Sequence, residues 1–497
     1  MRSVGFDIGK YLTLQSEKIL ERIAMFENKL YLEFGGKLFD DYHAARVLPG
    51  FIPDIKVELL KTLSDSAEIV IVINASNIDS SKAIGDSGIS YDDDVLRLID
   101  EFRNSGLYVG SVVISQYLGQ TAADKFKAHL EEYGITVYFL HYIPESDYPS
   151  NIQLILSDKG YGNNDYIETT RPLIVVTAPG PGSGKMAACL SQMYHENKRG
   201  IKAGYAKFET FPIWNFPLKS KINLAYEAAT ADINDVNMID PFHLEAYGIS
   251  AVNYNRDIEV FPILNAMFTR IWGESPYLSP TDMGVNMIGY CISDQEICDE
   301  AATQEIIRRY FNTKLDYAKG NVTKSAVSKL ELLMNNSGLT PDDRPPVRPA
   351  LQKTVETGSP SVAIELPDGM IVTGKTSNLL GASSAALLNA LKYLAKIDDE
   401  VLLISPVIIE PIQLLKVGFL GNENPRLHTD EVLVALSIST VTNPVAQLIL
   451  EQLPKLKNSE AHSSVILSQV DIGIFRQLGV NITCEPVYPN KRLFHGN

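Results

Sequence analysis

The sequence predicts an α/β fold built on an open, mostly parallel and doubly wound sheet of the Rossmann or phosphate-loop type. Two observations predict it. Short apolar runs such as EIVIVINA (68–75) alternate with amphipathic stretches such as DDDVLRLIDEFRNSG (92–106), and this alternation is typical of parallel strands covered by helices. The chain of 497 residues is also 45% hydrophobic, so it can bury several cores without disulfides or metals.

The expected strands and helices follow one another through the first part of the chain. Ser16 is expected to cap a first helix, and an extended hairpin is expected around Gly35 and Gly36. We expect strands at 68–75, 108–115, 135–142, 173–178 and 201–209, and helices at 92–106, 121–134 and 185–197. A helix stands between successive strands except at about 157–170, where a polar loop rich in Asn, Gly and Tyr is expected, and the series predicts that the sheet continues through this loop.

The middle of the chain has a different pattern of residue types. Aromatic and polar residues are interleaved from 210 to 290, as is typical of loops that line a site. Ser293 and Glu296 then predict a capping box at the start of a helix, and Gly338 is expected to end another. The last part of the chain predicts a hairpin turning at Asp368–Gly369, a strand at 400–405, helices interrupted at Pro444, a strand at 463–468, and a final helix and strand.

The proline-rich stretch PDDRPPVRP predicts a domain boundary, because its prolines exclude both a helix and a central strand. The expected division is an N-terminal α/β domain at 1–165, a phosphate-loop-like unit with a helical, loop-rich extension at 166–340, a linker at 341–350, and a separate C-terminal α/β domain at 351–497.

The charge balance limits the partners. The chain has 44 Lys and Arg against 60 Asp and Glu, which gives a net charge of -16. Binding to nucleic acid needs clustered basic residues, so we expect no nucleic-acid partner. A small anionic or phosphorylated ligand remains compatible with this charge, because a pocket can be locally positive in an acidic protein.

The four cysteines and the start of the chain bear on localisation. No two cysteines have Cys-x-x-Cys spacing, which indicates reduced thiols in a reducing compartment. The start lacks an apolar leader, and no run of 18 apolar residues is present. We therefore expect a cytoplasmic protein that does not contact a membrane. We also expect a homo-oligomer.

The most specific chemical signal is VTAPGPGSGKMAACL, which lies between an expected strand and an expected helix. Glycines in such a turn let backbone amides point at phosphate oxygens, and a lysine at the helix start adds positive charge. The expected phosphate-binding residues are Gly180, Gly182, Ser183, Gly184 and Lys185. This pattern predicts that the loop binds a nucleotide or a simpler phosphate.

The loop departs from the standard G-x-x-x-x-G-K-[ST] pattern in two places. Pro179 occupies the first glycine position, and Met186 replaces the Ser or Thr that holds Mg²⁺. The alternative interpretation is therefore a Gly/Pro-rich turn that binds nothing. The next strand ends with Lys207, Glu209 and Thr210, which are expected at the carboxyl edge of the sheet. This arrangement is similar to the dethiobiotin-synthetase type of phosphate-loop enzyme, in which a Lys follows the second strand. This resemblance covers only the loop and that strand. A surface Lys–Glu pair at a strand end is the alternative for Lys207.

A second cluster lies in DINDVNMIDPFHLEAYG. Carboxylates beside a histidine can ligate a divalent metal or transfer protons, so the candidate metal ligands are Asp235, Asp240, His243 and Glu245. The candidate catalytic residues are Lys207, Asp240 and, as a second phosphate clamp, Arg256. The alternative for Asp240 is an N-cap, because Pro241 follows it.

Three hypotheses of function remain open. The first is an enzyme of the phosphoryl-transfer or ligase type that uses the loop. The second is a metal-dependent hydrolase that uses the 232–245 cluster, and the third is a non-catalytic oligomeric scaffold or binding protein. The chain contains neither H-E-x-x-H nor G-x-S-x-G, so neither a zinc-peptidase motif nor a serine nucleophile elbow supports hydrolysis.

Longer stretches add a resemblance to a known family. GFDIGKYLTLQSEKI, YAKFETFPIWNFPL, NLAYEAATADINDVNMIDPFHLEAYG, SPTDMGVN and VTGKTSNLLGASSAALLNAL together resemble a bacterial family known as uncharacterised protein family 0371, or domain of unknown function 1846. The resemblance covers essentially the whole chain. It implies a cytoplasmic bacterial protein with a separate carboxyl-terminal domain, and it brings no catalytic residues to this sequence. Members have been labelled ATP-dependent peptidases, which the missing H-E-x-x-H does not support.

Overall fold

The computed structural model describes residues 4–82, 89–144, 146, 148–233 and 235–489. These residues form two compact units. The first contains the described parts of 4–302 apart from 231–233, and the second contains 231–233 with 303–489. Among the described residues, no helix combines the length and apolarity needed to cross a bilayer.

The first unit is built on a six-stranded, all-parallel sheet with the order β4-β3-β2-β5-β1-β6. Its strands are β1 (Leu30–Phe34), β2 (Ala67–Asn74), β3 (Tyr108–Tyr117), β4 (Thr136–His141), β5 (Leu173–Thr177) and β6 (Gly204–Phe208). Every residue of β1, β2, β5 and β6 is buried. Continuous apolar runs of this kind form strands covered on both faces, and the predicted α/β class is confirmed.

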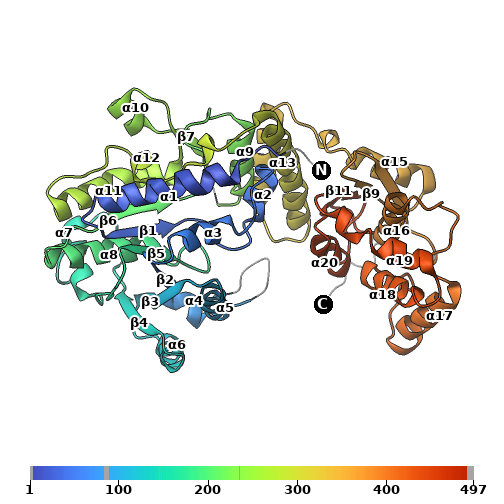
Figure 1. Ribbon diagram of the computed structural model, residues 1–497, viewed down its shortest axis with the longest axis horizontal. Coiled ribbons are helices and arrows are strands. Elements are labelled where there is room, and N and C mark those ends of the chain that lie inside the picture. Colours follow the sequence, from blue (N-terminus) through green and yellow to red (C-terminus); the bar gives the residue numbers. More distant parts are fainter. Residues whose placement is uncertain (1–3, 83–88, 145, 147, 234, 490–497) are drawn as a thin grey trace. The chain divides into compact units, whose positions relative to one another are not determined.

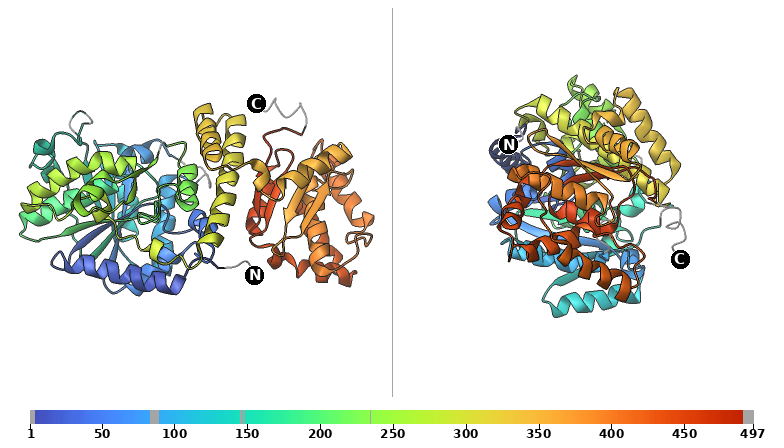
Figure 2. Two further views of the ribbon diagram at one scale, coloured as in Figure 1. Left: turned by 90° about the horizontal axis from the view of Figure 1, so that it is seen from above. Right: turned by 90° about the vertical axis from the view of Figure 1, so that its right-hand side faces the viewer.

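Helices cover both faces of this sheet (Figures 1 and 2). The side chains of β1 show the two faces, because successive residues of a strand point in opposite directions. The Tyr31 hydroxyl donates to Glu196 of α8, whereas Phe34 stacks on Phe208 at a ring distance of 4.3 Å. Gly204 of β6, on the Phe208 side, abuts the ring of Phe26 just beyond α1. The helix α8 therefore covers one face and α1 the other.

The remaining elements of the first unit surround these layers. Its helices are α1 (Ile8–Ala24), α2 (Tyr42–Val47), α3 (Ile55–Thr62), α4 (Ala75–Asp79), α5 (Tyr91–Asn104), α6 (Thr121–Glu132), α7 (Ile152–Ile155), α8 (Lys185–Lys198), α9 (Lys221–Ala229), α10 (Pro241–Tyr247), α11 (Asn255–Trp272) and α12 (Pro280–Met283), with 3-10 turns η1 (Tyr161–Asn163) and η2 (Ile288–Tyr290). A two-stranded ribbon joins β7 (Asn237–Ile239) to β8 (Val252–Tyr254).

The second unit has its own smaller mixed sheet, of order β10-β9-β11-β12, in which only β11 and β12 are parallel. Its strands are β9 (Ser361–Glu365), β10 (Ile371–Lys375), β11 (Glu460–Ser463) and β12 (Asn481–Cys484). Its helices are α14 (Lys324–Asn336), α15 (Val347–Thr357), α16 (Ala382–Ala395), α17 (Pro406–Leu414), α18 (Thr429–Ser439), α19 (Pro444–Leu450) and α20 (Gln469–Gln477). Three short turns are η3 (Pro341–Asp343), η4 (Leu415–Phe419) and η5 (Leu453–Leu456), and the long α13 (Gln295–Ala318) precedes α14.

Several expected elements differ from the structure for local reasons. The first helix begins at Ile8, because Asp7 rather than Ser16 supplies the capping carboxylate. No strand follows Gly36, since Asp40 has a φ of 56° and Asp41 caps α2. Asp294, not Ser293, accepts from the first amides of α13.

The C-terminal part of the chain differs in a similar way. The strand expected at 400–405 is absent, and Ser405 instead caps α17. The strand expected at 463–468 lies earlier, as β11. Helical turns occupy 341–343 and 347–350 of the predicted linker.

Candidate functional site

The glycine-rich loop joins β5 to α8 at the carboxyl edge of the parallel sheet. Two of its carbonyls accept hydrogen bonds from residues at the ends of β2 and β3. The Ser115 hydroxyl of β3 donates to the Ser183 carbonyl at 2.7 Å, and Nδ2 of Asn74, at the end of β2, donates to the Gly182 carbonyl at 3.4 Å. Gly184 caps α8 in the left-handed region without a side-chain hydrogen bond. Within the described residues, the amides from Gly182 to Ala187 have no protein acceptor.

Two glycines of the loop are also required by packing. A Cβ at Gly180 would lie 2.3 Å from the Tyr91 hydroxyl, and one at Gly184 would lie 2.8 Å from the Ser115 hydroxyl. Gly184 additionally has a φ of 90°, which side chains rarely adopt. The free amides, the helix N-terminus and Lys185 at the first helical position together make this edge attractive to an oxyanion.

Lys207 lies at the end of the edge strand β6, inside a cluster of acidic groups. Its Nζ is 2.6 Å from Asp257, 2.8 Å from the Tyr254 hydroxyl and 3.0 Å from Glu209. Burial alone would lower the pKa of Lys207. The three carboxylates Asp257, Glu209 and Glu33 instead raise this pKa well above its usual range, so Lys207 stays charged.

Glu209 is the carboxyl group of this cluster whose pKa is raised to near neutral pH. Burial raises the pKa of Glu209 to about 7, against the opposing effect of Lys207. The Tyr254 hydroxyl donates to its Oε1, which also faces Lys207. The structure pairs the Glu209 Oε2 with no other described group. A carboxyl group held in place with a pKa near 7 is suited to proton transfer.

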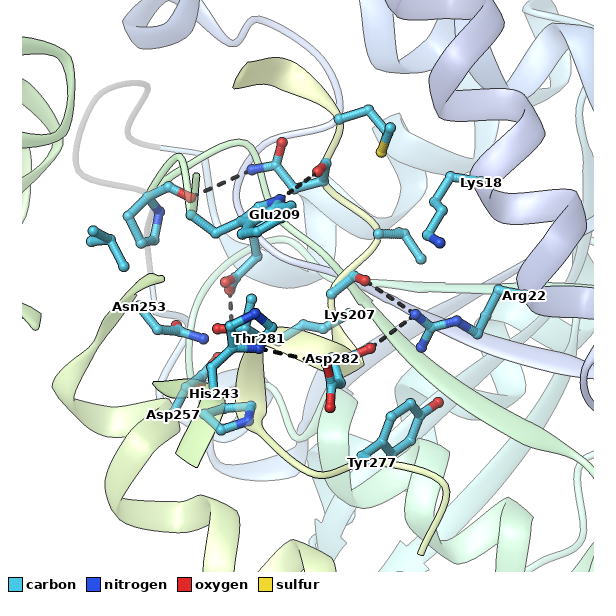
Figure 3. Close-up of a pocket in the computed structure, with 18 of the residues that line it drawn as sticks. Lys18, Arg22, Lys207, Glu209, His243, Asn253, Asp257, Tyr277, Thr281 and Asp282 are labelled. Carbon is cyan, nitrogen blue, oxygen red and sulfur yellow. Dashed lines mark hydrogen bonds and ion pairs between the residues drawn. The ribbon is translucent and has the colours of Figure 1, made fainter. Parts of the chain in front are cut away.

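A cavity of about 340 Å³ opens beside β6 (Figure 3). Glu209, Asn253 and His243 lie on one side of it, and Lys18 and Arg22 of α1 lie on the other. Its aromatic wall comprises Phe211, Trp214, Tyr247 and Tyr277. A concave site that combines apolar walls with a few convergent polar groups is typical of small-molecule binding.

Two further side chains of the cavity are held by neighbouring loops. Nδ1 of His243 lies 2.9 Å from the Ser279 hydroxyl and 3.6 Å from Asp282. Arg22 donates to the carbonyls of Asp282 and Gly284, at 2.8 and 3.3 Å. Because Val285 also donates its amide to the Lys207 carbonyl, the 279–285 segment joins α1 to the edge of β6.

The predicted metal ligands are not gathered around one point. Asp235 pairs with Arg256 at 2.6 Å, and Glu245 is exposed. Asp240 is fully buried and accepts hydrogen bonds from the amides of Phe242 and His243, which is the N-cap geometry of the alternative interpretation. Among the residues that the structure describes, no three His, Cys, Asp or Glu side chains are grouped to hold a metal ion.

The loop and the Lys207 cluster lie on the same face of the sheet. Burial raises the pKa of the Cys189 thiol of α8 well above its usual range; the Glu33 charge raises it further, and the Lys185 charge lowers it. Glu33 also acts on Lys207. β1, the strand that carries Glu33, lies between β5 and β6, so the two strand ends are about 10 Å apart.

Comparison with known proteins shows the family of the chain. Residues 4–338 match the model described as "Domain of unknown function DUF1846, N-terminal", and residues 342–494 match its C-terminal counterpart. The chain belongs to the DUF1846 family. It is 59% identical over 494 residues to a UPF0371 protein of Streptococcus pyogenes serotype M5 (strain Manfredo). This alignment covers 99% of this chain and 100% of the relative. A UPF0371 protein of Streptococcus uberis is 58% identical with the same coverage.

Both the loop and the cavity lie in the DUF1846 N-terminal region, and several of their residues were not predicted from the sequence. Glu33, Asn74 and Ser115 stand at or near strand ends, and Glu33 offered a signal as a charged residue within the apolar strand LYLEF. Arg22 and Asn253 have no such signal in the sequence. Arg22 belongs to α1 and Asn253 to β8, and no sequence pattern indicates that either element lies beside β6.

Proposed function

We propose that the chain is an enzyme of the phosphoryl-transfer or ligase type that binds the phosphates of a nucleotide or phosphorylated metabolite at Pro179–Lys185. The supporting observation is the set of unpaired amides from Gly182 to Ala187 at the N-terminus of α8. Successive free amides at a helix N-terminus bind phosphate oxygens. Lys185 supplies a further positive charge at the first helical position.

In this proposal the loop carries most of the positive charge that the phosphates need. The side chain of Met186 has no oxygen with which to ligate Mg²⁺, so a divalent ion would arrive with the nucleotide and would keep water in place of that ligand. Arg256 is already paired with Asp235, and its proposed role as a second phosphate clamp would require this ion pair to open.

The proposed place for a second reactant is the cavity beside β6. Glu209 accepts the proton of an attacking hydroxyl or amino group there, since its pKa of about 7 leaves both protonation states populated near neutral pH. Lys207 is bound to Asp257, Glu209 and Tyr254. It therefore acts as a positioning residue for Glu209, rather than touching the phosphate itself.

Isothermal titration of the full chain with ATP, GTP and inorganic phosphate tests the proposal. We expect heat of binding with at least one of them, and affinity at least about tenfold weaker in Lys185→Ala. Lys202→Ala removes an exposed lysine of the same unit, and it should leave the affinity unchanged. No heat with any of the three ligands, or equal losses in both variants, would contradict phosphate binding at the loop.

A further inference from the structure

The second unit presents an unusually large apolar surface on α17, η4 and α18 and on the residues that flank them. Ten aliphatic and aromatic side chains there are between 43% and 85% exposed. We call them the apolar face; they are Leu402, Val407, Leu414, Leu415, Val417, Phe419, Leu420, Val434, Ile438 and Val441. Together they present on the order of 1,000 Å² of apolar surface, whereas the largest patch on a typical monomer is roughly 300–600 Å².

The two helical segments that carry the apolar face lie side by side (Figure 1). At one end, Nδ2 of Asn443, just beyond α18, donates to the Leu403 carbonyl just before α17. At the other end, Lys416 of η4 pairs with Glu431 in the first turn of α18 at 2.7 Å. Side chains of both segments therefore contribute to one surface.

The helix α18 is apolar on two opposite sides. On α18, Val432 and Leu436 face the core of the unit, while Val434 and Ile438 face outward. A helix that is apolar all round is normally covered on all sides. The wide turn of η4 has the same effect, because it points Lys416 inward to Glu431 and the Arg426 carbonyl and leaves its apolar neighbours outside.

We infer that the apolar face is a self-association surface, which a second copy of this chain covers by the same face. A stable dimer buries about 800 Å² from each partner, and the apolar face supplies this area. In a two-fold contact each copy presents the same residues. These ten residues carry no charge, so the contact between them places no like charges directly against each other, although each chain has a net charge of -16.

The charges around the apolar face argue against a lipid bilayer as its occupant. Residues 402–441 contain four acidic and two basic side chains, whereas helices that lie on membranes are rich in Lys and Arg beside their apolar side. Lys416 is moreover buried and paired. The acidic surroundings of the apolar face repel anionic lipid, and its area suits a contact with an identical face. A second copy of the chain is therefore favoured over a bilayer as its occupant.

Sedimentation velocity of the full chain over a range of micromolar concentrations tests the inference. We expect a reversible dimer, whose dissociation constant rises at least about tenfold in Phe419→Asp and in Ile438→Asp. Val355→Asp is the matched control, because Val355 of α15 is 85% exposed but lies outside the apolar face. It should dimerise like the unaltered chain. Circular dichroism confirms that each variant is folded.

Three results would overturn the inference: a monomer at every concentration, dimers that both face variants leave intact, or equal weakening by Val355→Asp. Hydrogen exchange gives an independent measurement that needs no substitution. Amides within 405–441 should exchange more slowly as the concentration of the unaltered chain rises. Exchange that is independent of concentration there, in a sample that sediments as a dimer, would place the contact elsewhere and overturn the assignment.

Discussion

At the scale of single residues, the Lys207 cluster is governed by an excess of negative charge. One buried lysine faces Asp257, Glu209 and Glu33, and the Tyr205 hydroxyl donates to Glu33 at 2.7 Å. Keeping three neighbouring carboxylates charged at once costs free energy where water is excluded. The group that gives way is Glu209, which lies on the cavity wall with 22% of its side chain exposed.

This balance predicts how stability depends on pH. The pKa of Glu209 is about 7 in the folded protein, whereas an unperturbed glutamate, as in the unfolded chain, has a pKa of 4.5. Between pH 4.5 and pH 7 the folded state therefore holds a proton that the unfolded chain has released. Stability from this group is present below pH 4.5 and is lost as pH rises through 7. Glu209→Gln should therefore lose less stability than the unaltered chain between pH 5 and pH 8, by on the order of 3 kcal/mol.

Urea denaturation at the two pH values measures this difference. Other groups also titrate, so the comparison rests on the difference between variant and unaltered chain. Glu21→Gln serves as the control, because Glu21 also lines the cavity but has 61% of its side chain exposed. A Glu209→Gln variant with the same pH dependence as the unaltered chain would show that Glu209 does not titrate in this window.

Which of these residues the sequence could predict depends on how local their signal is. Lys207 was predicted because it ends a strand, and a strand end can be read from its own apolar run. Asp240 was given two interpretations, and the N-cap geometry agrees with the one that needed only its neighbour Pro241. Asp257 of α11 reaches Lys207 through the fold alone. No pattern in the sequence states that the start of α11 lies against β6.

At the scale of elements, the same division holds. The strands of the parallel sheet were predicted because continuous apolar runs are local signals, and all five expected between residues 68 and 209 are present. The second strand of the hairpin expected around Gly35 and Gly36, and the strand expected at 400–405, are absent because their ends cap helices. A cap depends on one side chain and one dihedral angle, which weigh little in a pattern of hydrophobicity.

The strand–loop–helix element predicts a specific cost for losing a glycine. Gly184→Ala places a Cβ at a φ of 90° and 2.8 Å from the Ser115 hydroxyl. We expect it to lower the free energy of unfolding by about 2–4 kcal/mol and to remove phosphate binding. Gly106 has a φ of 77° with nothing within 4 Å, so Gly106→Ala should cost only about 1 kcal/mol.

Urea denaturation and phosphate titration of the two variants separate strain from contact. The two glycines share a left-handed backbone, so they differ mainly in what the added Cβ would touch. Equal losses of stability would mean that Ser115 moves aside, and retained phosphate binding in Gly184→Ala would mean that the loop tolerates the change.

At the scale of the whole molecule, the described residues form two cores, and the chain passes from the first to the second between Ala302 and Thr303, within α13. Arg344 shows what the proline pattern at 341–349 misses. It lies within the predicted linker but is fully buried, 2.9 Å from Glu460 and 2.6 Å from the Asn481 carbonyl. Prolines signalled the absence of a long helix there, but no local pattern signals that an arginine will enter a distant sheet.

Because each unit contains a buried ion pair, substitutions in the two units should shift two different unfolding transitions, which calorimetry can detect. Removing one partner of a buried ion pair leaves the other uncompensated and costs about 3–5 kcal/mol. Arg344→Met should therefore lower the melting temperature of the second unit by roughly 10 °C and leave the first unit unchanged. Lys207→Met should do the reverse, because its partners Asp257 and Glu209 belong to the first unit. Differential scanning calorimetry of both variants would then assign the two transitions. If each variant lowered a single common transition, the two cores would unfold as one cooperative body.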